Sequence, residues 1–200
     1  ENRQYQNHLE EMVASQVAEM TRMQDEVITG IANLIESRDG STGLHVKNTQ
    51  NYVQILTKAL REKGMYPDIL DHNYELNTVK ASVLHDIGKI KTPDAILLKP
   101  GRLTDEEFEV MKQHTVAGCE IIDRIIGNVE HEEYVDIARK IARYHHERWD
   151  GTGYPDGLSG EEIPLCARIM ALADVFDALY QDRCYKKAIR PASKVFEIIK

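Results

Sequence analysis

The segment LNTVKASVLHDIGK, residues 76–89, carries the pattern that decides the fold. Its apolar side chains recur at helical spacing, which predicts a helix with one buried face from about 74 to 88. His85 and Asp86 interrupt that face at the end of the helix. Burying either group costs several kcal/mol unless the group is paired or ligated. A satisfied hydrogen bond in the core would explain one such pair. Other residues of the chain must therefore show whether the pair is hydrogen-bonded or bound to a metal ion.

Other histidines and an aspartate repeat this conflict between burial and polarity. Asp174 interrupts another apolar helix, and two acidic groups that face one core need a shared cation. His145 and His146 are adjacent at the predicted end of a helix, where protonated neighbours would repel each other. Neutral ligation of a metal explains the pair economically, although a solvated surface pair remains an alternative.

Seven candidate ligands result from this search, and they include five imidazoles and two carboxylates. They are His45, His85, Asp86, His114, His145, His146 and Asp174. Both ligand types suit transition metals, and a carboxylate can bridge two ions. Seven ligands exceed the need of one ion of coordination number four to six, so the sequence predicts a site for two metal ions.

Composition narrows the class of protein. A chain of 200 residues suits one domain with an appendage, and a net charge of -8 argues against broad binding of a nucleic-acid polymer. No apolar run reaches the 18 residues of a membrane helix, so no membrane contact is expected. Cys119, Cys166 and Cys184 form no paired motif, which favours a reducing compartment and a cytoplasmic location. A first residue other than Met and an apolar final segment indicate a truncated fragment.

The first part of the chain, residues 1–37, predicts one long helix. Val13, Met20, Val27 and Leu34 recur every seven residues, as in a coiled-coil seam. The series could pack on the chain's own domain. We favour a helix for dimerisation or signal transmission, because polar residues dominate its first dozen positions.

The remainder, 38–200, predicts an all-α domain without alternating strand patterns. Further helices are expected over about 43–62 and 131–146, and a capping box at Thr104 should open the helix that carries His114. The segment 147–163 is irregular and rich in glycine. It suits a structural Ω-loop, a rim that covers a substrate, or both.

Ordered motifs from about residue 36 to 200 resemble the HD-GYP domain, a bacterial branch of the HD metal-dependent phosphohydrolases. They are Arg38-Asp39 with Thr42-Gly43-Leu44-His45, His85-Asp86-Ile87-Gly88-Lys89, Lys99-Pro100 to Leu103-Thr104, His114 to Gly118, His145 through Gly153-Tyr154-Pro155 to Ile163-Pro164, Asp174-Val175-Phe176-Asp177-Ala178-Leu179, and Asp182-Arg183. A lone His-Asp pair would carry almost no information, whereas so many elements in one order make a chance match improbable.

The resemblance implies an HD-domain helical bundle that hydrolyses cyclic dinucleotide second messengers. The main substrate of the family is cyclic di-GMP, which is opened to linear pGpG and in some cases cleaved to GMP. By position, the first metal takes His45, His85, Asp86 and Asp174, and the second takes Asp86, His114, His145 and His146. Asp86 would bridge the ions, which activate a hydroxide for attack on the phosphate.

The resemblance also implies substrate contacts. Lys89 matches the lysine at the scissile phosphate, and Arg183 and Lys186 match basic positions that hold the dinucleotide. Tyr154 in the glycine-rich loop is expected to contact the substrate. Ser41 stands where members with a third metal have a glutamate, so two ions are expected.

The metals, the partners and the exact substrate are expected only as classes. A ligand set without thiolate favours iron or manganese, with nickel or cobalt also open. A homodimer through the N-terminal helix and an upstream sensory or receiver domain are the expected partners. The substrate could instead be 3',3'-cyclic GMP-AMP, or the domain could be a receptor that binds without catalysis. Retention of all seven ligands argues for the enzyme.

Overall fold

The computed structural model describes residues 2–38, 44–127, 132–181 and 188–199, and these form an all-α structure. The helices are α1 (Asn2–Ser37), α2 (His45–Glu62), α3 (His72–Ala81), α4 (Asp94–Leu97), α5 (Asp105–Ile126), α6 (Glu132–Tyr144), α7 (Leu165–Tyr180) and α8 (Ala192–Ile199). Three short 3-10 helices complete the set: η1 (Ser82–Leu84), η2 (Ile87–Lys91) and η3 (Gly160–Glu162). No strand occurs in the described ranges, so the predicted fold class is confirmed.

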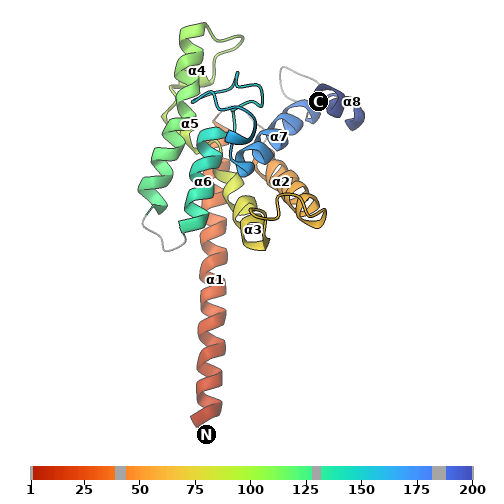
Figure 1. Ribbon diagram of the computed structural model, residues 1–200. Coiled ribbons are helices and arrows are strands. Elements are labelled where there is room, and N and C mark those ends of the chain that lie inside the picture. The colour runs from red at the N-terminus through yellow and green to blue at the C-terminus, as the bar shows by residue number, and fades with distance from the viewer. Residues whose placement is uncertain (1, 39–43, 128–131, 182–187, 200) are drawn as a thin grey trace.

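Helix α1 projects far beyond the body formed by the other helices (Figure 1). Its side chains from residue 3 to 24 are all exposed, and the helix joins the core toward its end, through buried Ala32, Ile35 and Glu36 and the partly buried Ile28. The predicted heptad series lies on the exposed side, with relative exposures from 52% for Val13 to 69% for Leu34. Packing of this series on the chain's own domain is therefore not observed.

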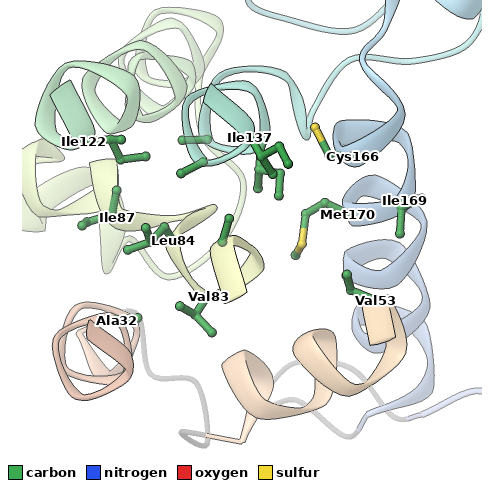
Figure 2. Packing of buried hydrophobic residues seen from close by; sticks show 14 of the residues in the cluster. Ala32, Val53, Val83, Leu84, Ile87, Ile122, Ile137, Cys166, Ile169 and Met170 are labelled. Atoms are coloured by element: carbon green, nitrogen blue, oxygen red, sulfur yellow. The ribbon is translucent and has the colours of Figure 1, made fainter. Parts of the chain in front are cut away.

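The core is built where α2, α3, α6 and α7 meet around η1. Ile141 and Met170 are fully buried there, and each such side chain contributes about 1.5–3 kcal/mol by leaving water. Figure 2 shows Ala32 of α1 at one edge of this cluster and Ile169 of α7 at the other. This packing holds the elements that carry the candidate ligands.

The predicted helix over 74–88 is wrong in its second half. Helix α3 ends at Ala81, and the chain continues through η1 and η2, with His85 and Asp86 between them. The physical reason is a close approach to α5: a Cβ added to Gly88 would lie 1.8 Å from the His114 carbonyl oxygen. Tight 3-10 turns with glycine at the contact permit that approach.

One predicted helix boundary agrees with the structure, and a second differs by two residues. The Thr104 side chain accepts a hydrogen bond from the Glu107 backbone N–H, and the Glu107 carboxylate accepts one from Thr104, so the predicted capping box opens α5. Helix α6 ends at Tyr144 and not at the predicted residue 146, so the histidine pair directly follows the helix. None of the described helices combines the length and the hydropathy of a membrane span.

Candidate metal centre

The seven predicted ligands, which come from five parts of the chain, gather in one region. They form two groups in which the ligand atoms lie within 4.8 Å of one another. The His45 cluster contains His45 of α2, His85 and Asp174 of α7; the His114 cluster contains Asp86, His114 of α5, His145 and His146. Each group could hold a metal ion.

Asp86 lies between the two clusters. Its Oδ2 atom is 3.3 Å from His85 Nε2, and its Oδ1 atom is 3.3 Å from His114 Nε2 and 3.6 Å from His145 Nε2. One carboxylate oxygen therefore faces each group. This is the arrangement that a carboxylate shared by two ions requires.

Backbone carbonyls orient three of the imidazoles. His85 Nδ1 lies 2.9 Å from the Ser82 carbonyl oxygen, and His114 Nδ1 lies 2.7 Å from that of Met111. His145 Nδ1 lies 3.0 Å from the Ile141 carbonyl oxygen in the same way. A carbonyl can only accept, so Nδ1 carries the proton and Nε2 presents a lone pair toward the cluster.

Asp177 performs the same task for His45, and the sequence did not assign it a role. Its Oδ2 atom lies 2.6 Å from His45 Nδ1, and the carboxylate is 2% exposed. Asp177 follows Asp174 by three residues on α7, so the two carboxylates share a helix face. That spacing was the available signal. A second unassigned carboxylate, Glu36 of α1, approaches His45 Nε2 at 3.6 Å.

The residues fit a bound cation. His85 Nε2 and Asp86 Oδ1 are both buried and have no hydrogen-bond partner among the described residues. An unsatisfied buried polar atom costs about 1–3 kcal/mol, and more when it is charged. A metal ion would satisfy both atoms, and a set of imidazole and carboxylate donors without thiolate suits a transition metal.

The two clusters differ in their titration. Burial alone would lower the pKa of His45, but hydrogen bonds to Asp174 and Asp177 raise it to about 10. Burial lowers the pKa of His114 to about 4, and the neighbouring Asp86 only partly offsets that effect. Burial and the neighbouring His145 also lower the pKa of His146. In the metal-free protein, the His45 cluster favours a positive charge and the His114 cluster excludes one.

The carboxylates at the centre are held ionised. Burial would raise the pKa of Asp86, but Lys89 and His85 lower it well below its usual range. The pKa of Asp174 is likewise lowered against burial, mainly by the hydrogen bond to His45. Both groups are therefore negative at neutral pH and available as ligands.

Lys89 reaches the centre from η2. Its Nζ atom lies 2.7 Å from Asp86 Oδ2, and its side chain is 18% exposed. The ammonium group is thus fixed beside the carboxylate that faces both clusters.

The glycine-rich loop is braced internally and also touches the centre. Glu147 Oε1 accepts hydrogen bonds from the backbone N–H groups of Asp156 and Gly157, at 2.7 and 3.1 Å. The Tyr154 ring centroid lies 4.8 Å from that of His146. A structural Ω-loop and a rim over the site are therefore compatible.

Arg183, Lys186, Ser41 and Cys184 lie outside the described residues.

A family model described as the HD domain matches residues 7–200. The chain belongs to the HD domain family. The resemblance to HD-GYP domains is also confirmed. Curated relatives that share this HD domain are named cyclic di-GMP phosphodiesterases, the activity that the resemblance implied.

Three relatives illustrate the similarity. A "Probable cyclic di-GMP phosphodiesterase" of Vibrio cholerae is 45% identical over 184 residues, which cover 90% of this chain and 41% of the relative. A "Cyclic di-GMP phosphodiesterase response regulator" of Xanthomonas campestris is 39% identical, over 90% of this chain and 44% of the relative. A "3'3'-cGAMP-specific phosphodiesterase" of V. cholerae is 39% identical, over 80% of this chain and 28% of the relative. The chain spans less than half the length of each.

Proposed function

We propose that this HD domain is a phosphodiesterase that uses two metal ions to hydrolyse cyclic di-GMP to linear pGpG. Further cleavage of pGpG by the same site would yield GMP. The observation that carries the proposal is the position of Asp86, whose two oxygens face separate clusters at 3.3 Å. The names of the relatives supply the substrate class.

The ligands divide between the proposed ions by cluster. His45, His85, Asp86 and Asp174 would hold one ion, and Asp86, His114, His145 and His146 would hold the other. Nitrogen and oxygen donors favour iron or manganese, with nickel or cobalt as further candidates. When bound, such ions would supply a nucleophile from water at neutral pH and would offset charge on the phosphodiester.

The remaining chemistry falls to side chains around the clusters. Lys89 is proposed to stabilise negative charge that develops on the scissile phosphate, because its ammonium already sits beside Asp86. Tyr154 lies over His146, where its ring can pack against the dinucleotide. Arg183 and Lys186, which lie outside the described residues, are proposed to bind the second phosphate and the bases.

Product analysis tests the activity. The purified protein, loaded with iron or manganese under reducing conditions, should convert cyclic di-GMP to pGpG, as followed by liquid chromatography. Lys89→Gln should lower kcat by about 100- to 1000-fold, the usual loss for one donor that stabilises transition-state charge.

Lys91→Gln is the matched control, because Lys91 also belongs to η2 but pairs with the exposed Glu120. It should retain wild-type turnover. A metal-loaded wild-type protein that binds cyclic di-GMP without forming product would contradict the proposal and favour a receptor that signals through α1.

A second candidate substrate is 3',3'-cyclic GMP-AMP, because one relative is named for it. The values of kcat/KM for both cyclic dinucleotides, measured on one preparation, decide between them. A higher value for cyclic GMP-AMP would transfer the proposed activity to that substrate.

We also propose that α1 forms a homodimer through its exposed heptad series and links this domain to an upstream sensory or receiver domain. Met20 of the series is 65% exposed on the described chain, which suits a partner helix. Met20→Lys should shift the mass in solution from dimer to monomer by light scattering. Ala18→Lys, away from the seam, should leave a dimer.

Since the proposed substrate is a second messenger, the activity is assigned to the cytoplasm.

A further inference from the structure

Arg38, the residue that directly follows α1, reaches across to η2. Its Nη1 atom lies 3.4 Å from the Lys89 carbonyl oxygen and 3.3 Å from that of Ile90. Its Nη2 atom lies 3.4 Å from the Thr92 carbonyl oxygen and 2.6 Å from Asp94 Oδ1. One guanidinium group therefore donates to three carbonyls at one end of a single short helix, 51 to 54 positions away in the sequence.

The carbonyls at this end of η2 need donors from outside the helix. The last carbonyls of a helix have no partner within the helix itself. Thr92 follows η2 and donates its backbone N–H to the Lys89 carbonyl at 3.0 Å, and Arg38 supplies further donors. A guanidinium group suits this task, because its N–H groups form a rigid planar fork. Arg38 is thus a cap of η2 that comes from α1.

The other end of η2 is held by α5. Gly88 lies so close to the His114 carbonyl that a Cβ at this position would clash with it. Lys89 directly follows Gly88, and its own carbonyl accepts from Arg38. The backbone that carries the Lys89 ammonium is therefore held on both sides, and the ammonium lies 2.7 Å from Asp86 Oδ2.

We propose that Arg38 is a positioning residue: by capping η2, it holds the Lys89 ammonium beside Asp86 and ties the catalytic geometry to the end of α1. The inference rests on the proposed function, in which Lys89 stabilises charge on the scissile phosphate. A movement of α1 relative to η2 would displace the guanidinium group and, with it, the backbone of Lys89. The position of α1 would thereby regulate the rate of hydrolysis.

Turnover of cyclic di-GMP by the full chain loaded with Mn²⁺ tests this role. Arg38→Gln should lower kcat by about 10- to 100-fold, because a misplacement of roughly 1 Å in an active site has an effect of up to about that size. The KM and the metal content should stay at the wild-type values, since no predicted metal ligand is among the hydrogen-bond partners of Arg38. A loss of bound metal in Arg38→Gln would place the effect at the metal centre and overturn the inference.

A double variant shows whether Arg38 acts through Lys89. Arg38→Gln added to Lys89→Gln should cause no further loss of kcat, because the ammonium that Arg38 positions is then absent. The losses from two independent residues would multiply instead. Full multiplication in the double variant would therefore overturn the inference.

Two further variants separate position from charge. Arg139→Gln is the matched control, because Arg139 is exposed to a similar degree and pairs with Asp123 on α5; it should keep the wild-type kcat. Arg38→Lys keeps the charge beside Asp94 but lacks the planar fork, so its kcat should fall nearly as far as that of Arg38→Gln. A wild-type kcat in Arg38→Lys would reduce Arg38 to an ion pair with Asp94 and overturn the inference.

Should Arg38→Gln fail to fold by circular dichroism, Arg38→Lys takes its place in the double variant. The failure of the inference is distinct from that of the proposed function. Wild-type kcat in a folded Arg38→Gln variant would overturn the inference alone, whereas a metal-loaded wild-type chain that forms no product would overturn both.

Discussion

The His45 and His114 clusters use the same types of side chain but place them in opposite electrostatic surroundings. Asp174, Asp177 and Glu36 all approach His45, and its pKa rises to about 10. His114 has Asp86 as its carboxylate neighbour and two imidazoles beside it, and its pKa falls to about 4. The number of carboxylates near the ring, more than the number of histidines, decides whether a cluster attracts positive charge.

Asp86→Asn should have the largest effect, because it removes the one carboxylate that both clusters share. Asparagine has only one oxygen and no charge, so it cannot serve both sites, and both ions should be weakened by more than the roughly 10- to 100-fold caused by losing a supporting group. Metal content and pGpG formation should fall together. Two retained ions with full turnover would show that Asp86 does not join the clusters.

His114→Gln should affect only the His114 cluster, since it removes a donor from that cluster alone. We expect one ion per chain, with the ion at the His45 cluster retained, and turnover lost. His72→Gln is the control, because His72 is exposed at the start of α3 and distant from both clusters in sequence. Loss of both ions in His114→Gln would mean that the clusters do not fill independently.

Asp177→Asn should act on the His45 cluster alone and more weakly. The asparagine cannot balance charge on the His45 ring, so affinity at that site should fall by about 10- to 100-fold, with the other site unchanged. Manganese titration measures both affinities. Asp136→Asn, at an exposed ion pair with Lys140 worth at most about 1 kcal/mol, should match wild type. Equal weakening of both sites would contradict a role confined to His45.

The pH dependence of the metal-free protein should show the smallest effect and the same contrast. The raised pKa of His45 gives a stabilisation that is complete below pH 6.5 and is lost as the pH rises toward 10. The lowered pKa of His114 has the opposite sign, because the unfolded chain binds a proton that the folded chain refuses, so stability falls from pH 6.5 toward 4. Urea unfolding with chelator should therefore show greatest stability near pH 6.5.

Two substitutions should each change a different limb of the profile of stability against pH. His114→Gln should flatten the acid limb between pH 6.5 and 4, and Asp177→Asn should flatten the alkaline limb. If each variant altered both limbs equally, the assignment of opposite electrostatics to the two clusters would fail.

Local patterns in the sequence were sufficient for much of the fold. The long first helix, the capping box at Thr104 and, to within two residues, the end of α6 follow from periodicity and from hydrogen bonds between near neighbours. The end of α3 at Ala81 did not follow, because the apolar spacing continues past it. Contact of Gly88 with α5 overrides the local preference, and the partner residue His114 lies 26 positions away.

The sequence by itself determined which side chains are available as ligands, and their order identified the family resemblance. The resemblance also predicted how they divide between two ions. Only the tertiary structure decided which oxygen of Asp86 faces each cluster, and that Asp177 and Glu36 approach His45. The physical reason is distance. Helical periodicity relates residues three or four positions apart, as with Asp174 and Asp177, whereas the meeting of α1, α2 and α7 depends on how their apolar faces pack together.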